Sequence, residues 1–305
     1  GFKKISSNIE KIEYSDIPNI IKSFKRKNNT HKYIKGKVAI RASSYSYPGA
    51  GILSAKAAYA TGSSYVNLVI WRGDDSDAHE EFNYLISSIK STYPDIIIGD
   101  ERALMFGPND CSSLLYGPGI VDYTIINRND SELMGDTENY LVNLPSSKNI
   151  VIDSGGFSSI SKIDWYHENA ILTPHVGELK RIFNLKDDVI INIDLLKLIQ
   201  NSIENKIIVL KSFNTFIITK DIIYIMDKGP SLLATAGTGD VLSGILVSLL
   251  SQGYSRLEAS ILGTYLHAEA ANYYMNNISK DGMTASDLVD CIPFALNILR
   301  EKSEH

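Results

Sequence analysis

Cysteine is scarce in this chain: among 305 residues only Cys111 and Cys291 occur. Two cysteines cannot form a disulfide framework or a zinc cluster. Disulfide-poor chains are typical of reducing compartments, so we expect a cytoplasmic protein. Apolar runs long enough for a membrane helix are also missing, and the N-terminus lacks the apolar core of a secretion signal. These absences exclude disulfide-scaffold and membrane-spanning classes and favour an ordinary globular protein.

Excess positive charge is missing as well. The formal net charge is -5 and hydrophobic residues make up 44% of the chain. A nucleic-acid-binding protein would be expected to carry a basic footprint, so no nucleic-acid partner is predicted. The one basic run, residues 21–37, fits a solvated connector better than a phosphate clamp. The length allows one large α/β domain or two small ones, with a substantial core.

The chain divides into a polar N-terminal segment and a patterned remainder. Residues 1–35 are rich in Lys and Asn, and we interpret them as an arm packed on the main domain or as the remnant of a linker. Residues 36–305 are predicted to be one domain, because short apolar strands alternate with helices, which indicates a mostly parallel sheet covered on both faces. The predicted strands are 37–40, 65–71, 95–100, 112–119, 149–156, 169–175 and 206–212, with a hairpin at 215–226 at the end of the sheet; the predicted helices are 49–62, 79–93, 239–252, 256–277 and 285–301.

Turn residues follow several of these strands. In an open α/β sheet, the carboxyl ends of the strands line the crevice where ligands bind. One such turn means little, but four that converge with a fifth loop indicate a site. The four are Tyr47-Pro48-Gly49-Ala50, Gly117-Pro118-Gly119, Thr173-Pro174-His175 and Lys211-Ser212.

The fifth loop is ATAGTGD, residues 234–240, directly before a long apolar helix. Free N–H groups and the positive end of the helix dipole at such a point bind anionic oxygen. Asp240 in the same turn can act as a base toward an oxygen whose charge these amides stabilise, which suits phosphoryl transfer to a hydroxyl. The alternative is a Gly-rich turn in which Asp240 is only the N-cap of the helix.

Here the residues resemble a known family. ATAGTGDVLSG (234–244) is similar to the anion-hole signature of the ribokinase-like superfamily, and the wider set resembles the ADP- or ATP-dependent NAD(P)H-hydrate dehydratases. The resemblance covers about residues 30–295. The other matching segments, in order, are HKYIKGKVAI (31–40), YPGAGILSAKAAYATGSSYV (47–66), LLYGPGI (114–120), ILTPHVGELKRIF (171–183), IIVLKS (207–212) and GMTASDLVDCIP (282–293).

The resemblance implies a three-layer α/β/α fold and an enzyme of nicotinamide nucleotide repair. Such enzymes use ADP or ATP, with Mg²⁺, to phosphorylate the 6-hydroxyl of (S)-NAD(P)H-hydrate, and loss of phosphate regenerates NAD(P)H. Bacterial members resemble ADP users, so ADP is the first choice. Carried over by position, Asp240 is the base; Gly237, Thr238 and Gly239 stabilise the phosphoryl group; Ala50, Gly119, His175 and Asp240 hold the hydrated dinucleotide; Lys211, Ser212, Phe213, Asn214, Thr215 and Gly239 contact the nucleotide; Glu178 organises Mg²⁺ through water.

A purely structural role remains an alternative for several of these residues. His175 can merely satisfy a loop carbonyl, Glu178 can serve the dipole of a helix's first turn, and Lys211 can be an exposed strand end. His267 lies in an apolar helical stretch and is predicted to be a packed core residue rather than a ligand.

The chain also departs from the family pattern. The family's second acid after the central strand is replaced by Gly155, Arg41-Ala42 stand where Gly-Gly is usual, and Phe213 interrupts a segment of small residues. These changes leave room for a nucleotide-binding relative without activity. A further alternative is a superfamily kinase of a small alcohol of the thiazole or pyrimidine type. The resemblance also implies a homo-oligomer, tetrameric by analogy, and a chain that can follow an epimerase domain.

Overall fold

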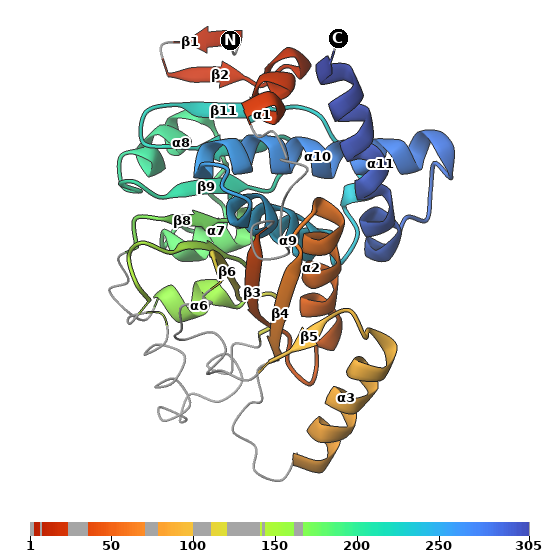
Figure 1. The fold of residues 1–305 in the computed structure, drawn as a ribbon. Coiled ribbons are helices and arrows are strands. Elements are labelled where there is room, and N and C mark those ends of the chain that lie inside the picture. The colour runs from red at the N-terminus through yellow and green to blue at the C-terminus, as the bar shows by residue number, and fades with distance from the viewer. Residues whose placement is uncertain are drawn as a thin grey trace.

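In the computed structural model, one mixed sheet runs through the molecule (Figure 1). The structure describes residues 3–6, 8–23, 36–70, 79–99, 111–120, 141, 144–161 and 167–304. Within them the strand order is β1-β2-β11-β10-β9-β8-β7-β6-β3-β4-β5. The strands are β1 (Lys3–Ser6), β2 (Ile9–Lys11), β3 (Lys37–Ala42), β4 (Tyr65–Ile70), β5 (Ile97–Ile98), β6 (Ser113–Tyr116), β7 (Asn149–Ile152), β8 (Ala170–Leu172), β9 (Ile207–Leu210), β10 (Thr215–Ile218) and β11 (Ile223–Met226).

The central strands are parallel, as the continuous apolar runs predicted. Strands β5, β4, β3, β6, β7, β8 and β9 pair in parallel, each with its neighbour in the sheet. Strands β10 and β11 form the predicted antiparallel hairpin. Side chains on β3, β6 and β9 are buried along their whole length, because helices cover both faces of the sheet.

Two apolar cores, one on each face of the sheet, make three layers. Alternate residues of a strand point to opposite faces; on β3, Val38 and Ile40 join one core and Ala39 joins the other. The first core lies under α1 (Ile17–Ser23), α2 (Pro48–Thr61), α3 (His79–Thr92), α9 (Thr238–Ser251), α10 (Arg256–Asn277) and α11 (Ala285–Glu304). The second lies under α6 (Gly156–Ser161), α7 (Val176–Ile182) and α8 (Ile193–Gln200). The predicted three-layer α/β/α fold is confirmed.

The N-terminal segment contributes strands that the sequence pattern did not reveal. Strand β2 pairs in parallel with β11, and β1 pairs with β2. The prediction that the hairpin ends the sheet is therefore wrong, because two more strands lie beyond β11 (Figure 1). Ile12 and Ile17, which follow β2, are fully buried. Among the described helices, none combines the length and apolar character needed to cross a bilayer.

Candidate active site

Helix α9 begins at a glycine whose backbone no other residue adopts easily. Gly237 is the N-cap with φ 89°, in the left-handed region that favours glycine. A methyl group on it would lie 2.8 Å from Leu53 Cδ1 and 3.0 Å from Ala285 Cβ. Thr238 is then the first helical residue and Asp240 the third. The interpretation of Asp240 as the N-cap is wrong, so its carboxylate is not used to cap its own helix.

The first turn of α9 leaves two amides without a protein acceptor. The Thr238 hydroxyl lies 2.7 Å from the carbonyl oxygen of Leu233 and 2.8 Å from that of Thr235, and the Thr238 amide also donates to Thr235. Within the described part of the chain, the amides of Gly239 and Asp240 donate to no residue. Together with the helix dipole, these two amides form a site for anionic oxygen. Thr238 shapes this site through the loop, since its hydroxyl already binds backbone carbonyls.

The Asp240 carboxyl lies in a poorly solvated position next to other charges. Ser54 of α2 donates its hydroxyl to the Asp240 backbone oxygen at 2.9 Å, which ties the start of α9 to α2. Burial and the charge of Asp153 raise the pKa of Asp240 to about 7; Lys211 opposes this shift and Glu178 adds to it. A carboxyl group with a pKa near neutrality can exchange a proton with a substrate under physiological conditions.

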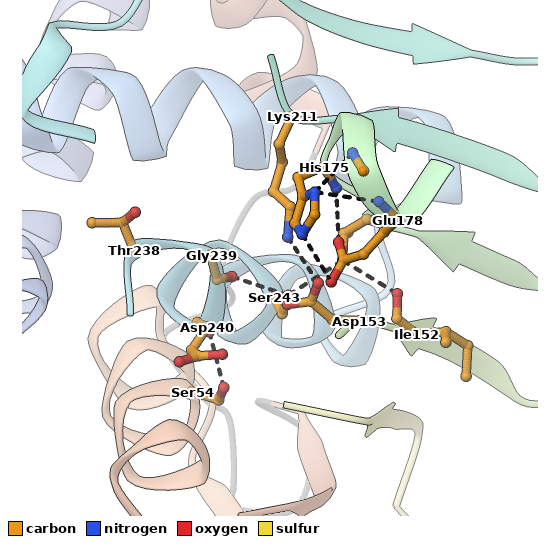
Figure 2. Close-up of polar contacts among 12 residues, drawn as sticks. Ser54, Ile152, Asp153, His175, Glu178, Lys211, Thr238, Gly239, Asp240 and Ser243 are labelled. Carbon is orange, nitrogen blue, oxygen red and sulfur yellow. Dashed lines mark hydrogen bonds and ion pairs between the residues drawn. The ribbon is translucent and has the colours of Figure 1, made fainter. Parts of the chain in front are cut away.

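The Lys211 side chain extends from the end of β9 toward the first turn of α9 (Figure 2). Its ammonium lies 2.8 Å from Asp153 Oδ1, and its side chain is 24% exposed. The interpretation of Lys211 as an exposed strand end is therefore wrong. Burial lowers the pKa of Lys211, but the charges of Asp153, Glu178 and Asp240 and the hydrogen bond with Asp153 outweigh burial and raise it. Lys211 is therefore a fixed cation at the mouth of α9.

Asp153 is the site residue that sequence analysis missed. It follows β7, is 1% exposed, and accepts a hydrogen bond of 2.6 Å from Ser243 of α9 as well as the ion pair with Lys211. The signal was present: a lone acid directly after a buried strand, at the carboxyl edge of a parallel sheet.

Gly155, which stands in place of the family's second acid, lies in a tightly packed turn. A methyl group on Gly155 would lie 2.0 Å from the backbone oxygen of Ile120. The turn after β7 packs directly on the turn after β6, where a methyl group on Gly117 would lie 1.9 Å from the Asp153 oxygen. No side chain fits at position 155 with this backbone, so the departure from the family pattern accompanies close packing of the two turns.

His175 and Glu178 form a capping box at the start of α7. Nδ1 of His175 accepts from the amides of Gly177 and Glu178, and Glu178 Oε2 accepts from the His175 amide at 2.8 Å. His175 therefore caps a helix; among the described residues its ring donates to no loop carbonyl, and its side chain is still 53% exposed. It lies beside Lys211 as a parallel bridge partner. The structure brings both residues to the predicted edge, where Nε2 of His175 is 3.5 Å from Glu178 Oε1.

Ala50 and Gly119 lie side by side. A methyl group on Gly119 would lie 2.7 Å from Ala50 Cβ, and Gly119 has φ 66°. The turns that carry them are joined by a 2.6 Å hydrogen bond from the Ser43 amide to the Pro118 oxygen. The two predicted substrate residues are thus brought together, and Ala50 belongs to the same helix as Ser54, which binds Asp240.

The turn after β9 is exposed. Phe213 is fully accessible to solvent, and the Ser212 hydroxyl donates to the Asn214 oxygen within the turn. Thr215 begins β10, opposite Met226. The backbone of Lys211 is held by a 2.8 Å hydrogen bond to the Pro174 oxygen. The predicted nucleotide segment therefore forms a solvent-facing rim whose first residue reaches into the site.

Among the described residues, no group of three or more His, Cys, Asp or Glu side chains could hold a metal ion. Glu178 is a single carboxylate, already bonded to the His175 amide. Mg²⁺ is commonly bound by one or two carboxylates together with waters and substrate phosphates. The residues thus fit a magnesium ion that arrives with a nucleotide, and they do not form a protein cage.

His267 is confirmed as a packed core residue. It is 8% exposed, and its Nε2 donates to the Thr238 oxygen at 2.8 Å. Burial lowers its pKa to about 4. Neutral His267 therefore links α10 to the first residue of α9 from behind the site.

Comparison with known proteins agrees with this geometry. A family model described as NAD(P)H-hydrate dehydratase matches residues 38–294. The bifunctional NAD(P)H-hydrate repair enzyme of Dictyoglomus turgidum is 28% identical over 98% of this chain and 58% of its own length. The ADP-dependent (S)-NAD(P)H-hydrate dehydratase of Neisseria meningitidis serogroup B is 28% identical over 84% of this chain and 82% of its own. The chain thus spans little more than half of the bifunctional relatives that it matches along most of its length, at 58% and 53%.

Solved structures share the fold. The ADP/ATP-dependent NAD(P)H-hydrate dehydratase of Bacillus subtilis, co-crystallized with ATP and Mg²⁺, superposes with a TM-score of 0.71. It is 20% identical, and the match covers 94% of this chain and 97% of that one. A ribokinase from Thermotoga maritima gives a TM-score of 0.51 at 14% identity over 86% of this chain and 99% of that one. The architecture is therefore ribokinase-like.

Proposed function

Because the chain belongs to the NAD(P)H-hydrate dehydratase family, we propose that it converts (S)-NAD(P)H-hydrate to NAD(P)H at the expense of ADP or ATP. The proposal places the reaction at the carboxyl edge of the sheet, at the start of α9. The match to this family over nearly the whole main domain counts against a small-alcohol kinase, whereas a relative without activity is tested by the assay below.

One observation supports the proposal most directly. Asp240, with a pKa raised to about 7, lies in the same helical turn as two amides that have no acceptor in the described part of the chain. The Lys211 ammonium lies beside that turn: a methyl group on Gly239 would be 3.2 Å from its Nζ. A base and an anion site in one turn, with a cation beside it, are the parts that phosphoryl transfer to a hydroxyl requires.

The chemistry follows from these parts. Ionised Asp240 accepts the proton of the 6-hydroxyl as the oxygen attacks the terminal phosphorus of the nucleotide and the bond to the bridging oxygen breaks. The Gly239 and Asp240 amides and Lys211 stabilise the charge on the transferred group. Inorganic phosphate then leaves with the electron pair of the carbon–oxygen bond, and loss of a proton from the adjacent carbon restores the ring double bond.

The remaining roles are proposed from position. Ala50 and Gly119 pack against each other close to Asp240 and would hold the nicotinamide ring, with the exposed ring of His175 at the other side. The turn Lys211–Thr215, together with Gly239, would hold the nucleotide. Gly237 and Thr238 set the loop that carries the free amides.

Magnesium would enter bound to the nucleotide phosphates, with Glu178 as its nearest carboxylate, through water. When bound, it would neutralise phosphate charge. We also propose that ADP is the preferred co-substrate and that the protein is cytoplasmic. By family analogy we propose a homo-oligomer, specifically a tetramer. Light scattering on the purified protein tests this oligomeric state.

The direct test is incubation with chemically hydrated NADH, with ADP or ATP, with and without Mg²⁺, while absorbance of the reduced nicotinamide is followed. We expect recovery of NADH that depends on nucleotide and on Mg²⁺. A parallel reaction with a thiazole alcohol and ATP should give no phosphorylated alcohol. Phosphorylation of the alcohol with no recovery of NADH would establish the kinase instead, and nucleotide binding with neither reaction would establish the inactive relative.

A further inference from the structure

Asp153 is held in one orientation by three elements. Its amide donates to the Tyr116 oxygen of β6 at 3.0 Å, which fixes the backbone. Its Oδ2 accepts from Ser243 of α9 at 2.6 Å, and its Oδ1 meets Lys211 of the β9 end at 2.8 Å. Figure 2 shows the carboxylate between these two partners, with Asp240 on the other side of the α9 ribbon from Lys211. With both oxygens engaged and 1% exposure, this carboxylate does not rotate freely.

Lys211 needs a carboxylate partner to hold its ammonium in one position. A lysine ammonium is a compact charge on a flexible stem with four rotatable bonds. Here Asp153 fixes its direction, so that Nζ lies next to Gly239 and its unpaired amide. Without Asp153, the nearby carboxylates of Asp240 and Glu178 would attract the ammonium instead.

We propose that Asp153 is a positioning residue, which holds the Lys211 ammonium at the start of α9, where the phosphoryl group passes. The inference rests on the proposed function, since it assigns work within the same site. Asp153 acts through Lys211 and Asp240 and does not itself touch the substrate.

Stability alone gives a poor reason for this ion pair. Removing two charges from water costs as much as their attraction returns, so buried pairs contribute little net stability. A pair at this depth in a sheet otherwise packed with Ile, Leu and Val therefore calls for a reason in the chemistry. The geometry gives such a reason, because the ion pair lies next to the anion site and the base at the start of α9.

The charges around Asp240 predict how each member of the ion pair affects its titration. Asp153, after β7, and Glu178, on α7, raise the pKa of Asp240, whereas Lys211, after β9, lowers it. On α2, Ser54 contacts only the backbone oxygen of Asp240. Removing either member of the ion pair should thus shift the titration of Asp240, but in opposite directions. An ion pair without electrostatic coupling to Asp240 would shift neither.

The experiment compares Asp153→Asn with Lys211→Met in the pH dependence of kcat/KM with hydrated NADH and ADP. We expect the acid limb to move down by about one pH unit in Asp153→Asn and up by about one unit in Lys211→Met. Both variants should lose about 10²-fold in kcat and bind ADP more weakly by calorimetry. Limbs that stay in place, or that move in the same direction, would overturn the inference.

A matched control lies at the opposite end of the same strand. Lys206 precedes β9 and pairs with Glu204 at 3.3 Å, at the amino edge of the sheet away from Asp240. Lys206→Met should leave the pH profile and the affinity for ADP unchanged. This control separates the loss of a lysine ion pair on β9 from the loss of this particular one.

A second measurement does not depend on turnover. NMR titration of isotope-labelled aspartate carboxyl carbons reports the pKa of Asp240 directly, with its signal assigned by absence in Asp240→Asn. The same opposite shifts are expected in the substrate-free protein. If the unchanged protein fails to repair hydrated NADH, the proposed function fails, while this titration still decides the coupling between Asp153, Lys211 and Asp240.

Ser243→Ala serves if Asp153→Asn does not fold. It keeps every charge but removes the 2.6 Å hydrogen bond that orients Asp153, together with the longer contacts of the same hydroxyl to the Gly239 oxygen and to Thr173. We expect a roughly tenfold loss in kcat with an unmoved acid limb, since only position changes. Unchanged kinetics in Ser243→Ala would contradict the positioning role.

Discussion

At the scale of single residues, the site holds Asp240 in a state that folding alone would not select. Its carboxyl has a pKa of about 7, against an ordinary value of 3.8, chiefly because of burial. Between these two values the unfolded chain has lost this proton while the folded protein still holds it. Ionisation in the folded protein is thus unfavourable, and the stability penalty grows from about pH 4 to its full size above about pH 7. Burial of the Asp240 carboxyl thus favours proton transfer near neutral pH and lowers the stability of the folded protein.

The first prediction follows for Asp240→Asn. Turnover should fall by about 10³-fold, because an amide cannot accept the proton of the hydroxyl. Stability at about pH 8 should rise on the order of 2 kcal/mol, allowing for partial exposure of the carboxyl. Thermal unfolding followed by circular dichroism should show a Tm higher by about 4 °C.

The pH dependence provides the control for this prediction. At about pH 4, Asp240 is protonated in the folded state and close to half-protonated in the unfolded state, so the stability difference between the two proteins should nearly vanish. In the unchanged enzyme, kcat/KM should decline below about pH 7, in step with protonation of the base. A variant that keeps full turnover would show that Asp240 is not the base, and one that gains no stability at alkaline pH would show that the pKa of Asp240 is not raised in the folded protein.

Several of the residues gathered at this edge could be predicted from sequence and others could not. Asp240, Lys211, His175 and Ala50 sit in recognisable turns after strands, and the structure brings them to one edge. The contacts between side chains of neighbouring strands depend on three-dimensional distances, which a short stretch of sequence does not contain. Asp153 also follows a buried strand, but its pairing with Lys211 and Ser243 could not be read from the sequence.

At the scale of secondary structure, the placement of Asp240 depends on how closely α9 approaches α2. Gly244 makes that approach possible: a methyl group on it would lie 2.3 Å from the Ser54 oxygen and 2.9 Å from Ala57 Cβ. The same contact brings Ser54 within 2.9 Å of the Asp240 oxygen. The glycine in the middle of α9 thus sets the position of the residue at its start.

Gly244→Ala is accordingly predicted to separate the two helices. Because the clash involves backbone and not the end of a flexible side chain, unfolding free energy should fall by about 2 kcal/mol, measured by urea denaturation. Turnover should fall as well, since Asp240 moves relative to Ala50.

Gly49→Ala is the matched control, because a methyl group on Gly49 meets no atom within 4 Å. There the loss of backbone freedom in the unfolded chain should leave stability unchanged or raise it by roughly 0.5 kcal/mol. Equal effects at the two glycines would refute the close-packing argument.

Helices and strands could be predicted where their burial produces a clear pattern of apolar residues in the sequence. Continuous apolar runs gave the central strands, and the ends of α9, α10 and α11 lie within three residues of those predicted. Strands β1 and β2 were missed because their sequences, KKIS and IEK, are short and mostly polar. What makes them strands is the free edge of β11, which lies far away in sequence.

At the scale of the whole molecule, the N-terminal segment completes the sheet. The Ile12 amide donates to the Ile225 oxygen at 2.9 Å, and the Ile223 amide to the Asn8 oxygen at 3.0 Å. Lys11 forms an ion pair with Asp227 at 2.6 Å. This segment therefore covers the edge of β11, and exposed edges of this kind promote association between molecules.

Removing residues 1–23 is thus predicted to damage the fold although every site residue remains. The loss of buried Ile12 and Ile17 and of the edge pairing should lower Tm by about 5 °C or more, with concentration-dependent association in size-exclusion chromatography. Ile12→Ala, at a position with 0% exposure, should lose about 3 kcal/mol, whereas Ile5→Ala, at 54% exposure, should lose almost nothing. A truncated protein with unchanged Tm would mean that the segment is a linker after all, because a linker contributes no buried surface to the domain that it precedes.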